Sequence, residues 1–300
     1  MRIGQLVREG LEYLNRKLRN TIGFPCRLDR TSMPIYRFAD LSSKRLDPYR
    51  NLRTTNLTRR SGQFIAESKP LVKRLVDSGL QIDSFLIDEK YVDDAVQWLP
   101  TETDLFVVPG TLVSELVGFS FHRGYLACGI RPKLLSPTPE VWQAIPGWLG
   151  VMLVGVQDPE NMGSIFRTCA ALGISDVLIG PECVDPFARR VLRVSMGNAF
   201  KLKVFDGIHT IPFVESCISK GIETIAASLK DPSQDLSSFT LHGPTLVLFG
   251  NEAHGLPSPV QDIVSRRVRI DMELGTDSLN VSVAAGIILH NLRRGCCRKS

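Results

Sequence analysis

Three segments of the 300-residue chain carry polar side chains that the packing of helices and strands does not require. Asn161 follows one apolar run, Glu252 follows another, and Asp277, Ser278 and Asn280 crowd the start of the last apolar stretch. A single Ser or Asp is enough to cap the free amides at the start of a helix. The remaining amide, carboxylate and hydroxyl groups are therefore available to bind a ligand.

Each of these residues also has a purely structural explanation. Asn161 could cap a helix, Glu252 could be a charge on a surface loop, and Ser278 could cap the last helix. Only their convergence in space would favour a functional site over these explanations.

The elements that must position these residues form an alternating α/β pattern after about residue 148. Short runs that are apolar on both faces predict strands, with helical segments between most of them: GVMLVGV, SDVLIG, LKVFD, ETIAASL and PTLVLFG. This pattern indicates a parallel sheet covered by helices on both faces. Ligands of open parallel sheets bind at the carboxyl ends of the strands, so we expect the polar residues to meet there.

Two helices should frame this edge. The first has an apolar face made of Met162, Ile165, Phe166, Cys169 and Leu172, and Gly173 is a plausible stop. Arg167 lies beside that face rather than on it. The last helix, which reaches Leu292, is apolar almost all round.

Familiar nucleotide and hydrolase motifs are missing from the sequence. No strand is followed by Gly-x-Gly-x-x-Gly, which disfavours a dinucleotide site, and the chain has neither a P-loop nor a nucleophile elbow.

Composition divides the chain further. Residues 1–60 form a basic extension, residues 61–133 have a compact α/β pattern, and residues 134–147 are a proline-rich linker before the second domain at 148–300. Residues 1–75 contain 17 Lys and Arg against 6 Asp and Glu, a net charge of +11. A polyanion such as RNA suits this segment, with Arg59 and Arg60 as candidate contacts. The alternative is a solvated basic face that binds nothing.

Cysteines and hydropathy bear on location. The seven cysteines are dispersed without metal-ligand spacing, which indicates reduced thiols in a cytoplasmic protein and no metal site. No run of about 18 apolar residues predicts a membrane span.

Several motifs resemble one family in the correct order. PENMGSIFRTCAALGISDVLIG, RVSMGNAF, LFGNEAHGL and DSLNVSVAAGIILHNL are similar to motifs of the SpoU (TrmH-type) RNA 2′-O-ribose methyltransferases of the SPOUT superfamily. The match spans roughly residues 150–292. The segment 64–132, which includes GFSFHRGYLACGIRP, more loosely resembles the L30e-like substrate-binding domain of that family.

The resemblance implies a fold and a cofactor. The fold is a Rossmann-like parallel sheet with a carboxyl-terminal trefoil knot, preceded by the smaller L30e-like α/β domain. The cofactor is S-adenosylmethionine, held mainly by backbone groups at Leu229, Gly250, Ile270 and Leu279. The family usually has Pro where this chain has Asp271, so the local loop geometry is expected to differ.

The resemblance also implies roles for the polar residues. The catalytic set is Asn161, Arg167, Glu252, Ser278 and Asn280. The resemblance implies that Arg167 acts as the base or as an activator of the nucleophile, but a guanidinium stays protonated above pH 12. A bidentate grip on the phosphate beside the target ribose is the safer role, which leaves the base unassigned.

The resemblance also bears on substrate and assembly. Ribosomal RNA is the expected substrate, with transfer RNA as the alternative. A catalytically inactive RNA-binding paralogue and a methyltransferase acting on a small molecule or protein remain as further alternatives. The family also implies a homodimer formed through the last helix and the first motif helix.

Overall fold

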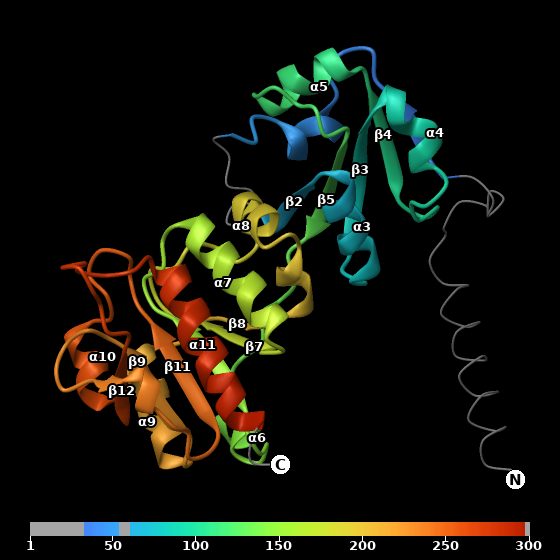
Figure 1. The fold of residues 1–300 in the computed structure, drawn as a ribbon. Helices are drawn as coiled ribbons and strands as arrows, with labels where there is room; N and C mark the ends of the chain where they lie inside the picture. Colours follow the sequence, from blue (N-terminus) through green and yellow to red (C-terminus); the bar gives the residue numbers. More distant parts are fainter. Residues whose placement is uncertain (1–32, 54–60, 298–300) are drawn as a thin grey trace, which may run out of the picture. The chain divides into compact units, whose positions relative to one another are not determined.

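The computed structural model describes residues 33–53 and 61–297, and Figure 1 shows the course of the elements. The first sheet has five strands in the order β1-β4-β3-β5-β2. They are β1 (Ile35–Arg37), β2 (Gln63–Glu67), β3 (Ile82–Asp88), β4 (Asp104–Val108) and β5 (Tyr125–Ile130). β1, β4 and β3 are parallel, whereas β5 runs antiparallel to both β3 and β2.

The helices beside the first sheet are short. They are α3 (Lys69–Asp77), α4 (Val92–Ala95) and α5 (Gly110–Val117), with 3-10 turns η1 (Lys44–Tyr49) and η2 (Glu89–Tyr91). Between η2 and β4, regular α-helix is confined to the four residues of α4.

The first sheet begins earlier in the chain than the sequence predicts. β1 pairs with β4, and η1 places Leu46 and Tyr49 in the same buried core as Phe106. Burial of these two apolar side chains holds their segment against the sheet, although it is basic overall. The segment from β1 to Leu52, which lies within the predicted extension 1–60, therefore packs on this sheet.

The second sheet has seven strands in the order β10-β12-β9-β11-β6-β7-β8, and every neighbouring pair is parallel. The strands are β6 (Leu149–Leu153), β7 (Asp176–Ile179), β8 (Lys203–Phe205), β9 (Glu223–Ala227), β10 (Gln234–Asp235), β11 (Thr245–Phe249) and β12 (Arg266–Arg269). The central strands β6 and β11 are buried along their whole length, as expected for strands covered on both faces.

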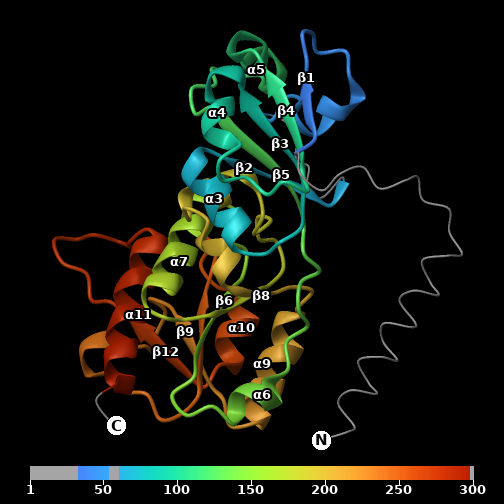
Figure 2. The same cartoon turned by 90° about the vertical axis from the view of Figure 1, so that its right-hand side faces the viewer.

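Helices cover both faces of the second sheet. Figure 2 shows α7 and α11 on one face and α9, α10 and α6 on the other. These helices are α6 (Pro139–Gln143), α7 (Pro159–Ala171), α9 (Thr210–Ser219), α10 (Ser258–Ile263) and α11 (Val281–Cys297); α8 (Arg189–Val194), η3 (Asn198–Lys201) and η4 (Leu236–Ser238) complete the set. The predicted parallel sheet with two helical layers is confirmed.

Part of the predicted linker is structured. α6 lies within residues 134–147, and its Trp142 is buried and stacked on Trp148, with ring centroids 4.6 Å apart. Pro139 occupies the first turn of this helix, where its missing amide costs no hydrogen bond. One proline of the predicted linker therefore begins a helix.

The two helices that frame the site begin at identifiable caps. Asp158 accepts a hydrogen bond from the amide of Glu160 and caps α7, which ends before Gly173 at a φ of +70°. Asn280 accepts the amide of Ser282 and begins α11. Neither Asn161 nor Ser278 is the cap, so both alternative capping explanations are wrong.

Candidate active site

Asn251 fixes the turn that follows β11. Its Nδ2 donates a hydrogen bond to the carbonyl oxygen of Gly155, 2.8 Å away in the loop after β6. Its Oδ1 accepts the backbone amides of Ala253 and His254 at 2.9 and 3.1 Å. These bonds join the carboxyl ends of two adjacent strands and position Glu252 there. Asn251 is not among the predicted site residues, although an Asn directly after a buried strand is typical of a turn closed by its side chain.

Asn161 links Glu252 to the last helix. Its Nδ2 donates to Glu252 Oε1 at 3.0 Å, and its Oδ1 accepts from Asn280 Nδ2 at 2.9 Å. A carboxylate only accepts hydrogen bonds and helix amides only donate them, so the two ends of this chain set the orientation of both Asn side chains. Three predicted residues therefore form one hydrogen-bonded chain across α7, the β11 turn and α11.

Asn161 is almost fully buried between its two hydrogen-bond partners. It is 5% exposed, and a buried amide without partners destabilises a fold by roughly 1–3 kcal/mol. The site supplies both partners from other elements, so Asn161 couples the geometry of α7 to that of the other two elements.

Glu252 is held as a carboxylate. Partial burial raises the pKa of this carboxyl, but hydrogen bonds from Asn161 and from the amides of Asp158 and Gln157 outweigh burial, and the net pKa lies below its ordinary value. A carboxylate with a lowered pKa that these hydrogen bonds hold in place orients neighbouring groups and is a weak base.

We expect Glu252→Gln to lower the free energy of unfolding at neutral pH, by an amount that shrinks as the pH falls. A carboxyl whose folded-state pKa lies below its unfolded-state pKa, about 4.3, stabilises the fold above that value. This stabilisation disappears as the pH falls through the folded-state pKa. Urea unfolding of both proteins from about pH 7 to pH 3 measures the difference.

Glu215→Gln is the matched control, because Glu215 is exposed on α9 and none of the hydrogen bonds of the site involves it. Its difference from the wild-type protein should not vary with pH. A constant difference for Glu252→Gln across the series would show that the bonds to the ionised carboxylate are not responsible.

Arg167 and Ser278 lie apart from the hydrogen-bonded chain. Arg167 is exposed on α7, and none of the ion pairs among the described residues involves it. Ser278 is exposed in the irregular segment that precedes α11. Both side chains face solvent and are accessible to a ligand that approaches this edge.

The predicted cofactor positions follow neighbouring strands. Leu229 comes shortly after β9, Gly250 directly after β11 and Ile270 directly after β12, and the sheet order places β9 between the other two. Because the three strands are parallel, their carboxyl ends share one edge of the sheet. Leu229 is 49% exposed there, and Leu279 is half-buried just before α11.

Asp271 takes part in a small ion-pair network in the loop after β12. Arg269 Nε donates to Asp271 Oδ1 at 2.9 Å, and Arg269 Nη1 pairs with Asp231 at 3.2 Å. One guanidinium therefore ties the loop after β12 to the loop after β9.

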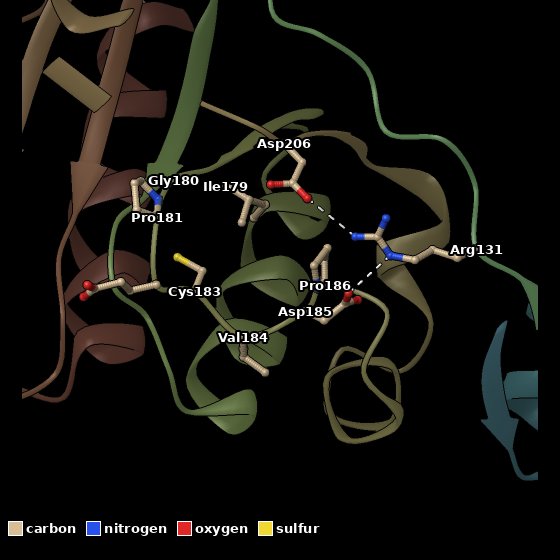
Figure 3. A pocket seen from close by; sticks show the side chains of 10 residues that line it. Arg131, Ile179, Gly180, Pro181, Cys183, Val184, Asp185, Pro186 and Asp206 are labelled. Atoms are coloured by element: carbon tan, nitrogen blue, oxygen red, sulfur yellow. Dashed lines mark ion pairs between the residues drawn. The ribbon is translucent and has the colours of Figure 1, made fainter. Parts of the chain in front are cut away.

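A cavity beside the ends of β7 and β8 contains an arginine whose charge is neutralised by two neighbouring carboxylates. Figure 3 shows Arg131 between Asp185 and Asp206, with N–O distances of 3.2 and 3.5 Å. Cys183 also lines this cavity, and burial raises the pKa of its thiol to about 11. The two carboxylates leave Arg131 no free charge for an anion, so this cavity is not assigned to the site.

The described residues contain neither a cluster of metal-ligating side chains nor a membrane-spanning helix. Within that part of the chain, no group of three or more His, Cys, Asp and Glu could hold a metal ion. No helix there is long and apolar enough to cross a bilayer. The candidate RNA contacts Arg59 and Arg60 lie outside the described residues.

Comparisons with known proteins agree on one family. The SpoU rRNA Methylase family matches residues 149–290. A Mycobacterium bovis protein described as an uncharacterized tRNA/rRNA methyltransferase is 30% identical over 276 residues, covering 85% of this chain and 90% of its own. A Synechocystis protein with the same description is 28% identical over 250 residues, covering 82% and 89%.

A solved structure supports the fold. The AdoMet-bound rRNA methyltransferase from Sinorhizobium meliloti superimposes with a TM-score of 0.73 at 24% identity, covering 87% of this chain and 98% of its own. With the fold, the ordered motifs and the long match to the mycobacterial relative in agreement, the chain belongs to the SpoU methylase family.

Proposed function

We propose that this protein transfers the methyl group of S-adenosylmethionine to a ribose 2′-hydroxyl of RNA. The observation that carries the proposal is the hydrogen-bonded chain from Glu252 through Asn161 to Asn280. It lies at the sheet edge where the predicted cofactor positions also gather. Relatives described as tRNA/rRNA methyltransferases support RNA as the substrate class.

The residues at the strand ends fit the proposed cofactor. Adenine and the methionine chain of S-adenosylmethionine need apolar contacts and backbone hydrogen-bonding groups. Leu229 and Leu279 supply partly exposed apolar surface, and Gly250 and Ile270 supply backbone at adjacent strand ends. When bound, the cofactor supplies an electrophilic methyl group on a sulfonium. We also propose that these loops form a trefoil knot and that the first domain has an L30e-like fold.

The protein's own side chains position the substrate. Exposed Arg167 grips the phosphate beside the target ribose with its planar fork and aims the hydroxyl. Glu252, fixed by Asn161, holds the β11 turn and the start of α7 in one arrangement. Ser278 presents its hydroxyl to the substrate from the loop before α11. Such positioning accounts for rate only when the attacking oxygen is held roughly 3–3.5 Å from the methyl carbon.

Substrate affinity is assigned mainly to the amino-terminal part. Its net charge of +11 over residues 1–75 suits a polyanion, with Arg59 and Arg60 as contacts. Ribosomal RNA is the proposed substrate, and transfer RNA is the alternative.

We expect a homodimer that Ile287→Asp converts to monomers. α11 packs on α7 through one face, yet Val283 and Ile287 on its other side are 49% and 42% exposed. Apolar side chains in a row on one helix face favour a partner surface. Light scattering at micromolar protein concentration gives the mass of both proteins.

Ile218→Asp on α9 is the control, because Ile218 is similarly exposed at 39% but lies on the opposite face of the sheet. It should leave the mass unchanged. A wild-type protein that is monomeric and active would contradict the dimer.

The activity is tested with labelled methyl groups. The full chain is incubated with methyl-labelled S-adenosylmethionine and RNA from a strain that lacks the gene, with protein as a parallel acceptor. Label in RNA, at a linkage that resists alkaline hydrolysis because the 2′-oxygen is blocked, is the expected result. Label in protein, or none in either acceptor, would contradict the proposal.

A further inference from the structure

A cavity of about 810 Å³ adjoins the proposed active site on the face of the sheet covered by α9 and α10. Its walls come from the loops after β6 and β7, the start of α9 and the β11–α10 turn. Glu252 belongs both to this cavity and to the hydrogen-bonded chain with Asn161. The volume is typical of pockets for small organic groups, roughly 300–1,000 Å³. None of the predicted cofactor positions lines it.

The charges of the lining residues exclude a phosphate. Glu182 and Glu252 line the cavity, and no Lys or Arg does. The lowered pKa of Glu252 keeps its carboxyl negative at neutral pH. An RNA phosphate would meet two carboxylates without a counter-charge, whereas a neutral group with N–H donors would find acceptors.

The other walls suit a flat heteroaromatic ring. Pro212, Pro257 and Ile211 contribute apolar surface, and His209 and His254 contribute aromatic rings. Histidine rings stack on unpaired bases in RNA-binding proteins, and Asp or Glu side chains accept hydrogen bonds from exocyclic amino groups.

Two residues that line this cavity are in states that destabilise the fold. Glu182 has a φ of +59°, a conformation that L-residues rarely adopt. Thr210, which is 7% exposed and lines the cavity, keeps its hydroxyl buried without a hydrogen-bond partner among the described residues.

We propose that this cavity receives an unpaired nucleobase of the RNA substrate, specifically a base that carries an exocyclic amino group. The proposal rests on the proposed function, since it assigns a specificity subsite to the same RNA. Adenine, cytosine and guanine can donate from an amino group to the carboxylates. Uracil has no amino group, and its one ring N–H lies between two carbonyl oxygens that would face the same carboxylates, so it pairs poorly with Glu182 and Glu252.

The test compares binding of two labelled homopolymers to the full chain. Oligocytidylate and oligouridylate of equal length carry the same phosphates, so the ratio of their affinities cancels the contribution of the basic segment. Fluorescence anisotropy without cofactor should give a preference of about tenfold for oligocytidylate, the ratio that one hydrogen bond to a charged acceptor supports.

Ile211→Trp fills the cavity and should reduce this preference to near parity. The matched control is Ile218→Trp, because both isoleucines lie on α9, are 37% and 39% exposed, and only Ile211 lines the cavity. The control should keep the wild-type ratio. A wild-type protein without a preference, or an Ile211→Trp protein that retains it, would overturn the proposal.

A second pair of variants tests the charge of the cavity wall without adding bulk to it. Glu182→Gln should reduce the preference at least twofold, about the smallest change that anisotropy resolves, whereas Glu215→Gln on the exposed side of α9 should not. Binding needs no methyl transfer, so the two proposals fail separately. A base preference without methylation refutes only the enzyme, and methylation without a base preference refutes only the subsite.

Discussion

Arg167→Ala should reduce methyl transfer to RNA by at least about 100-fold, the usual effect of removing one charged group that stabilises a transition state. The side chain is exposed on α7 and forms no ion pair with the described residues, so its guanidinium is available to the substrate. The affinity for S-adenosylmethionine should stay unchanged, because the proposed cofactor positions follow β9, β11 and β12 rather than α7. Single-turnover methylation and calorimetric titration measure the two quantities.

Arg167→Lys separates a bidentate role from simple charge. A lysine is a point charge without the planar fork, so it should recover little of the lost rate. Arg190→Ala is the control, because Arg190 is also exposed but its guanidinium already pairs with Glu160. A lysine variant with nearly normal turnover would contradict the bidentate grip on phosphate.

Local patterns predict much of the second domain. The face formed by Met162, Ile165 and Phe166 is buried in α7, and Gly173 ends that helix with a positive φ. The apolar runs after residue 148 become parallel strands because strands covered on both faces have no polar side. Helix and strand identity here depends on neighbours close in sequence, which a pattern can capture.

Long-range pairing explains what the patterns miss. β1 has only three residues, its Ile35 is 42% exposed, and it is held by parallel pairing with β4 about 70 residues away. A short, partly exposed strand in a basic segment carries no periodicity. The sheet order β12-β9-β11-β6, which gathers the strand ends, is likewise a property of tertiary packing.

The candidate site shows the same contrast between what local patterns predict and what only long-range packing decides. Polar residues after buried strands indicate where a ligand could bind, and this identifies Asn161, Glu252 and Asn280. Sequence position alone could not show that Asn161 donates to one of these residues and accepts from the other. Nor could it show that Asn280 serves as helix cap and site residue at once, or that Arg167 stands apart from them.

Gly250→Ala should abolish binding of S-adenosylmethionine and destabilise the fold by about 3 kcal/mol, the upper part of the range for overpacking. A Cβ at this position would lie 2.2 Å from the carbonyl carbon of Gly255 and from the nitrogen of Leu256. Both are backbone atoms, and Leu256 is buried, so the clash has no flexible side chain to displace. Asn251 and Gly255 exchange two backbone hydrogen bonds of 3.0 and 2.9 Å. Relief of the clash must therefore open the turn that carries Glu252.

Two further glycines separate this clash from the ordinary effects of replacing glycine. Gly255→Ala places its methyl in open space but at a φ of +66°, so strain of about 1 kcal/mol is expected. Gly243→Ala meets nothing within 4 Å and has no positive φ, so its effect should lie within about 0.5 kcal/mol of zero. Urea unfolding should show the largest loss in free energy of unfolding for Gly250→Ala, a smaller loss for Gly255→Ala and the smallest for Gly243→Ala. Calorimetry should find that only Gly250→Ala no longer binds the cofactor. Equal losses at Gly250 and Gly255 would mean that backbone strain, rather than the close approach of two chain segments, is what requires glycine after β11.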